Sequence, residues 1–104
     1  MAQFDVYLNP NAETNHNIPY LVDVQADLLD VLATRIVIPL HTMTSMPKPA
    51  RHLNPILEIS GEKLVLSTSE LAGIPTSILG KPIDSLKAYR EDMITALDFV
   101  FTGI

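Results

Sequence analysis

The sequence has no cysteine and no tryptophan, and only 18% of its 104 residues are charged. The lack of cysteine excludes a disulfide scaffold and agrees with a reducing compartment. A chain of this length buries roughly two-thirds of its unfolded surface, so we expect one domain, residues 1–104, with a core that needs no metal. Because charge is sparse and 47% of the residues are hydrophobic, we also expect some apolar surface to meet a partner.

Positive charge is scarce as well. Twelve acidic residues face seven Lys and Arg, which gives a net charge of −5. Direct nucleic-acid binding requires a basic footprint, so we expect none. No basic, apolar leader follows Met1, and no run approaches the ~20 apolar residues of a membrane span. The sequence therefore predicts a cytoplasmic protein with no membrane partner.

Hydropathy patterns predict several strands followed by one helix, which is typical of a mainly β, α+β domain. Pro39 cannot donate to a sheet ladder, so we expect it at an edge or a bulge. Ser60, Gly61 and Glu62, flanked by residues 55–59 and 63–66, have the spacing and composition of a β-hairpin turn. Asp84 or Ser85 is the expected N-cap of the helix. The expected strands cover residues 3–8, 20–25, 35–40, 55–59, 63–66 and 74–79, and the helix covers roughly residues 86–101.

Residues that could carry catalysis are few. His16, His41 and His52 are far apart and show no metal-ligand spacing, so we predict no metal site. The serines lack a glycine-flanked elbow, and no glycine-rich phosphate loop is present. We therefore predict no catalytic residue and no cofactor.

One enzymatic reading stays open at this point. Arg35, with His41 or His52 as acid or base, has the chemistry of a ribonuclease site. Asp27 and Asp30 bracket a short bend, and we interpret them as residues that cap or solvate it. The acidic balance weighs against nuclease chemistry.

Three blocks of the sequence together resemble the CcdB family of toxins. They are residues 20–30 (YLVDVQADLLD), residues 35–40 (RIVIPL) and the closing residues 101–104 (FTGI). The opening QFDVY, the central LNPI and the segment LAGIP also fall in register, so the resemblance spans nearly the whole chain. It implies a small SH3-like barrel of antiparallel strands, shared with MazF ribonucleases, that ends in a long helix.

The resemblance also implies a function. Such a protein is a homodimeric toxin of a type II toxin–antitoxin system and is not an enzyme. It binds the A subunit of DNA gyrase, traps the gyrase–DNA cleavage complex, and is neutralised by a CcdA-like antitoxin, through which alone it reaches operator DNA. The gyrase-facing positions carried over to this sequence are Leu28, Leu29, Asp98, Phe101, Thr102, Gly103 and Ile104.

Two of these positions depart from the family pattern. The best-known member ends in Trp-Gly-Ile, whereas this chain has Thr102 before Gly103 and Ile104. Asp98 is charged where that member has an amide. Since tryptophan is a frequent interface anchor, gyrase poisoning is expected to be weaker, to depend more on Phe101, or to be lost.

Two alternatives to gyrase poisoning follow from the same residues. One is a MazF-like endoribonuclease on the same fold, and the other is a non-toxic relative that retains antitoxin binding. The antitoxin of this family folds onto its toxin from a disordered segment. Candidate antitoxin contacts are the loops over residues 9–17 and 43–50, with Lys48 and Arg51 available for acidic groups.

Overall fold

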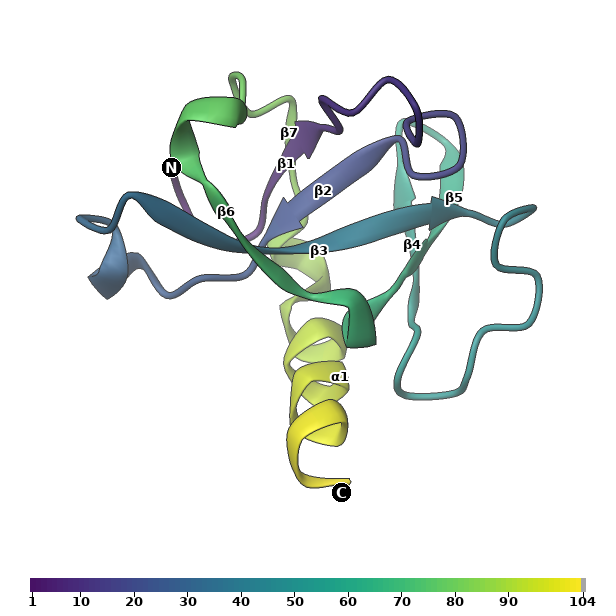
Figure 1. Ribbon diagram of the computed structural model, residues 1–104. Helices are drawn as coiled ribbons and strands as arrows, with labels where there is room; N and C mark the ends of the chain where they lie inside the picture. The colour runs from purple at the N-terminus through teal and green to yellow at the C-terminus, as the bar shows by residue number, and fades with distance from the viewer. Residues whose placement is uncertain (104) are drawn as a thin grey trace.

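In the computed structural model, which describes residues 1–103, seven strands form one antiparallel sheet that curls into a nearly closed barrel (Figure 1). The strands are β1 (Asp5–Leu8), β2 (Tyr20–Asp23), β3 (Thr34–Thr42), β4 (Ile56–Ile59), β5 (Glu62–Leu66), β6 (Ala72–Pro75) and β7 (Asp84–Ser85). Their order is β4-β5-β3-β2-β1-β7, and β6 pairs with β3 off this path. The expected mainly β fold with a C-terminal helix is confirmed.

Strand β3 lies at the centre of the sheet, so the expectation that Pro39 marks an edge or a bulge is wrong. Along one side β3 pairs with β2 from Val37 to Leu40, Leu21 lying opposite Pro39. Along its other side it pairs with β6 from Thr34 to Val37 and with β5 from Leu40 to Thr42. Pro39 falls in the gap between these two partners, where β3 can lack one N–H donor without breaking either ladder.

Both faces of the sheet carry buried residues. The larger core packs between the sheet and the helix and includes Val6, Val22, Ile38, Leu40 and Met93. A smaller cluster on the opposite face contains Tyr7, Val37 and Leu79, with Leu21 and Ile74 packed against it. The expected strand in residues 3–8 is therefore present. However, Tyr7, which was expected on the polar side, is buried, and Leu8, which was expected on the apolar side, is exposed.

The hairpin of β4 and β5 is confirmed, but Glu62, expected in the turn, belongs to β5 and pairs with Ile59. The strand expected at residues 74–79 lies earlier, because β6 ends at Pro75 and the chain continues as a 3₁₀ helix. The 3₁₀ helices are η1 (Asp27–Leu29), η2 (Thr68–Glu70), η3 (Thr76–Ile78) and η4 (Lys87–Tyr89).

Helix α1 (Arg90–Thr102) begins later than expected, after η4. Asp84 and Ser85 form β7 instead of capping α1, and Tyr89, the N-cap residue, makes no side-chain capping bond. The first half of α1 buries Met93 and Ala96 against the sheet, and its last turns extend away from it (Figure 1). Within residues 1–103, no helix is long and apolar enough to cross a bilayer.

Candidate functional site

The segment between β2 and β3 forms an apolar turn that juts out from one end of the sheet. The amides of Leu29, Asp30 and Leu32 each donate to the carbonyl three residues earlier, so 3₁₀-type turns continue beyond η1. At three residues per turn, Leu28 and Val31 share one side, and Leu29 and Leu32 share another. We call these four leucine and valine residues the apolar tip.

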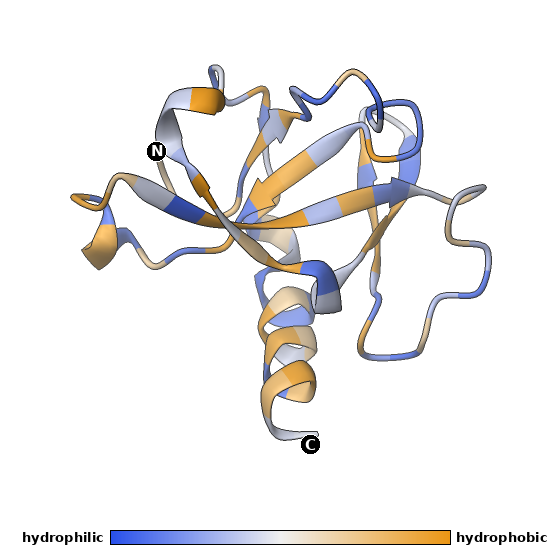
Figure 2. Ribbon diagram, in the orientation of Figure 1, coloured by the Kyte–Doolittle hydropathy of each residue, from blue (hydrophilic) through white to orange (hydrophobic). Residues whose placement is uncertain are grey.

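The apolar tip is exposed to an unusual degree for aliphatic side chains. Leu28 and Val31 are each 93% exposed, and η1 buries none of its residues. Figure 2 shows hydrophobic residues in this segment and in the last turns of α1. Burial of a large aliphatic side chain is worth about 1.5–3 kcal/mol, so exposing several together points to an interaction surface. Leu28 and Leu29 were expected here, whereas Val31 and Leu32 were not, although their three-residue spacing from the leucines was visible in the sequence.

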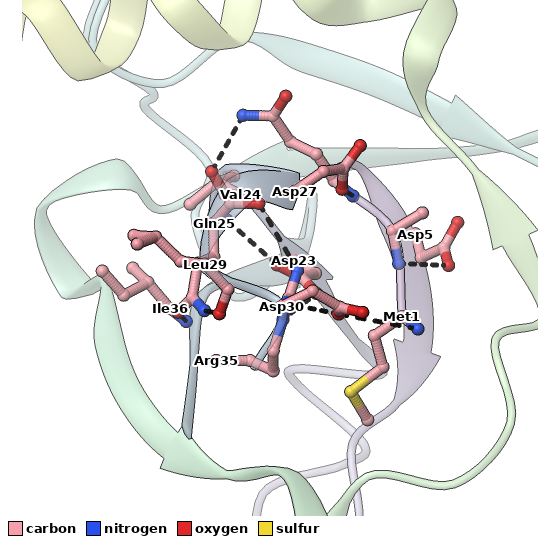
Figure 3. A network of polar contacts seen from close by, with 12 residues as sticks. Met1, Asp5, Asp23, Val24, Gln25, Asp27, Leu29, Asp30, Arg35 and Ile36 are labelled. Atoms are coloured by element: carbon pink, nitrogen blue, oxygen red, sulfur yellow. Dashed lines mark hydrogen bonds and ion pairs between the residues drawn. The ribbon is translucent and has the colours of Figure 1, made fainter. Parts of the chain in front are cut away.

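A buried polar network lies under the apolar tip (Figure 3). Arg35 Nε donates to Asp23 Oδ2 at 2.6 Å, and both side chains have no exposed surface. Arg35 Nη1 donates to Asp30 Oδ1 at 3.1 Å, and Nη2 donates to the Gln25 carbonyl at 3.4 Å. Burial alone lowers the pKa of Arg35, but its hydrogen bond to Asp23 and the charges of Asp23 and Asp30 raise it above its ordinary value.

These contacts correct the interpretation of Asp27 and Asp30 as residues that cap or solvate the bend. Asp30 binds the buried guanidinium of Arg35. Asp27 Oδ1 accepts a hydrogen bond of 2.8 Å from the backbone N–H of Gln3, which ties η1 to the start of the chain. Both carboxylates therefore hold the tip against the barrel.

The end of α1 presents the other expected residues. Asp98, Phe101, Thr102 and Gly103 are all exposed, Phe101 to 72%. Gly103 has a φ of 73° and its amide donates to the Phe99 carbonyl, so it ends the helix in the left-handed conformation that favours glycine. Thr102 Oγ1 donates to the Asp98 carbonyl at 2.6 Å. Ile104 lies outside the described residues.

A shallow apolar groove joins the tip to the helix end. It has a volume of about 210 Å³ and is lined by Val24, Gln25, Ala26, Leu29, Ile36, Leu71, Leu97 and Phe101. Leu29 and Phe101, far apart in sequence, thus share one surface, whereas Leu28, Asp98, Thr102 and Gly103 do not line it. The groove is smaller than the ~300–1,000 Å³ of ordinary small-molecule sites, and its size suits one or two side chains of a partner.

The structure does not bring together Arg35, His41 and His52, the residues of the ribonuclease hypothesis. Arg35 is buried and bound to two carboxylates. His41 Nδ1 lies 3.0 Å from Ser45 Oγ, and Nε2 lies 2.8 Å from Glu70 Oε1. His52 is exposed and lines a different cavity with Arg51 and Asp92. Arg35 as placed here cannot reach a substrate.

The candidate antitoxin loops are both irregular, as expected. The first is organised by Asn9, whose Nδ2 donates to Thr14 Oγ1 at 3.0 Å and to the Ile18 carbonyl at 2.8 Å. The second follows β3 and is exposed at Lys48 and Arg51. Their contact with an antitoxin stays a prediction.

Comparison with known proteins shows the fold and the family of this chain. Among solved structures, an "Endoribonuclease in complex with its cognate antitoxin from Mycobacterial species" is similar at a TM-score of 0.70 and 12% sequence identity, over 96% of this chain and 93% of that one. At this identity the likeness shows the shared fold. The family model described as "CcdB protein" matches residues 3–103. The chain therefore belongs to the CcdB family, the toxins of a class of toxin–antitoxin systems.

Proposed function

We propose that this protein binds the A subunit of DNA gyrase and traps the gyrase–DNA cleavage complex. In this proposal it acts in the cytoplasm as a homodimer, without a cofactor, and is neutralised by a CcdA-like antitoxin. The observation that carries the proposal is the high exposure of Phe101 and Leu28, at 72% and 93%, together with the groove that Phe101 shares with Leu29, the neighbour of Leu28.

The physical argument concerns what such a surface can do. Aliphatic and aromatic side chains held in water gain free energy when a partner covers them, and a few central anchors carry most of the energy of an interface. Phe101 is the largest exposed apolar side chain of this surface. Membership of the CcdB family supports a gyrase target, and in this proposal Phe101 is the anchor, while Leu28 and Leu29 make further contacts.

The surface supports binding better than catalysis. Arg35, the arginine of the ribonuclease reading, is enclosed, and its guanidinium is occupied by Asp23 and Asp30. Only the fold that this chain shares with an endoribonuclease favours RNA cleavage. Incubation of the purified, folded wild-type protein with RNA tests that second candidate, and cleavage that co-purifies with the protein and is blocked by its antitoxin would support it.

Binding to a purified gyrase A fragment is the decisive experiment. Phe101→Ala should weaken binding by about 10- to 100-fold, which corresponds to ~1.5–3 kcal/mol of lost burial. Phe99→Ala is the matched control, because two residues turn a helix by about 200° and place Phe99 on another side. Wild-type protein that does not bind the fragment but still binds its antitoxin would contradict the proposal and indicate a non-toxic relative.

Toxicity in cells gives an independent readout. Expression should arrest growth in a gyrase-sensitive host and spare a host whose gyrase A subunit resists such toxins. Equal toxicity in both would contradict gyrase as the target. Sedimentation of the free protein tests the homodimer, and a monomer at micromolar concentration would contradict that part.

A further inference from the structure

We propose that Gln25, Asp30 and Arg35 form a clamp that positions the apolar tip for its partner. This inference rests on the proposed function, since it assigns the tip to the target. It concerns how the tip is held and not which residues touch the target. The polar network of Figure 3 supplies the geometry.

The first half of the clamp is the side-chain amide of Gln25. Its Oε1 accepts a hydrogen bond of 3.1 Å from the backbone amide of Ile36, in β3. Its Nε2 donates at 3.0 Å to the carbonyl of Leu29, at the end of η1. Gln25 is 4% exposed, so it bridges the sheet and the tip with little competition from water.

The second half is the guanidinium of Arg35. Its Nε donates to Asp23, inside the barrel, and its Nη1 donates to Asp30, the residue directly after η1. A planar guanidinium with donors on several sides fixes direction as well as distance. Asp30 also lies 4.0 Å from the N-terminal amine, which is a second positive group facing it. The carboxylate of Asp30 is therefore held from the side of the barrel.

The tip has few other means of keeping its shape. None of the residues of η1 is buried, and a three-residue 3₁₀ helix has little stability of its own. Its conformation must come from the contacts at its two ends. A surface ordered before binding loses less conformational freedom when its partner arrives, so the clamp contributes to affinity without touching the partner.

Asp30→Ala is the variant that tests the clamp, because Asp30 is 56% exposed and its loss leaves the core intact. Amide hydrogen exchange at residues 28–33 should become about tenfold faster or more, while the midpoint of urea unfolding stays close to the wild-type value. Binding to the gyrase A fragment should weaken about tenfold, and antitoxin binding should not change. Asp30→Glu, which keeps the carboxylate, should recover part of the affinity.

Asp92→Ala is the matched control, since it removes an exposed carboxylate in the first turn of α1. It should leave both exchange and affinity unchanged.

Gln25→Met removes the hydrogen bonds of the other half of the clamp and should speed exchange at the same amides. Unchanged exchange at residues 28–33 in Asp30→Ala would overturn the clamp, and faster exchange with unchanged affinity would overturn its positioning role. Wild-type protein without gyrase affinity would overturn the proposed function instead, while the exchange data would still judge the clamp.

Discussion

Arg35 Nε and Asp23 Oδ2 lie 2.6 Å apart inside the barrel, and neither side chain has any exposed surface. The pair joins β3 to the end of β2. Removing one member of a buried ion pair leaves the other charge without compensation, which is more costly than the pair's own contribution to stability. The same contact occupies the arginine that an enzymatic reading would need.

Arg35→Met should therefore lower the free energy of unfolding by about 3–5 kcal/mol, because Asp23 then stays buried and unpaired. Urea denaturation followed by circular dichroism measures this change. Arg90→Met is the matched control, since Arg90 is exposed and reaches Glu91 only at 3.8 Å, a pair worth at most about 1 kcal/mol. Equal losses in the two variants would show that the buried pair has no special role.

Val31 should belong to the target-binding surface together with Leu28, because both occupy the outer side of the apolar tip. Val31→Asp places a charge there and should weaken binding to the gyrase A fragment at least tenfold. Stability should stay within about 0.5 kcal/mol of wild type, as for other surface substitutions. Ile83→Asp, at an exposed position before β7, is the control, and an equal loss of binding there would indicate a general charge effect.

Thr102→Trp should strengthen target binding about tenfold, since a tryptophan adds a large apolar anchor beside Phe101. Thr102 is exposed at the end of α1, so the larger side chain meets no core atom. The substitution also removes the hydrogen bond from Thr102 Oγ1 to the Asp98 carbonyl. Thr102→Val removes that bond alone and separates the two effects. Weaker binding by Thr102→Trp would argue that this helix end does not face the target.

Strand positions were predictable because alternation and turn residues are local signals. The β4–β5 hairpin could be placed from the turn residues 60–62 and the strand patterns on either side of them. The central place of β3 could not, because it depends on two different strands meeting on either side of Pro39. A single sequence shows that a donor is missing but does not show that the sheet has a gap there.

The family resemblance directed attention to Leu28, Leu29 and Phe101, which the structure shows to be exposed, and their contact with a target stays a prediction. The clamp under the apolar tip was not predictable, because the contact between Arg35 and Asp30 joins residues with no periodic relation. A lone arginine in an apolar strand has the same appearance in the sequence whether it is buried in an ion pair or available for catalysis. Only the fold distinguishes these cases.

Glu70 should make stability depend on pH in the acid range. A hydrogen bond from Ser67, and then the contact with His41, lower the pKa of Glu70 below its ordinary value. The resulting stabilisation is present above the ordinary glutamate pKa of about 4.3 and is lost as pH falls through the lower, folded-state pKa. Because Glu70 is half-exposed, we expect less than about 1 kcal/mol.

The unfolding free energies of wild type and Glu70→Gln, measured at pH 7 and pH 3, test this dependence. The difference between them should be largest at pH 7 and should shrink at pH 3. Glu62→Gln, at an exposed carboxylate without an ion pair among residues 1–103, should show no such change. A difference that grows toward acid would reverse the assigned sign.

The turn of the β4–β5 hairpin should tolerate glycine and reject alanine. Ser60 and Gly61 have φ values of 51° and 82°, as a two-residue turn between twisted strands requires. An added Cβ at Gly61 meets nothing within 4 Å, so the cost of Gly61→Ala, about 1–2 kcal/mol, comes from the backbone conformation alone.

Gly73→Ala is the matched control, because its site is equally open and its φ is not positive. This variant should be neutral or stabilise the protein by up to about 1 kcal/mol. Ser60→Gly should stabilise, since it relieves strain at a positive φ, and destabilisation by Ser60→Gly would contradict this account of the turn.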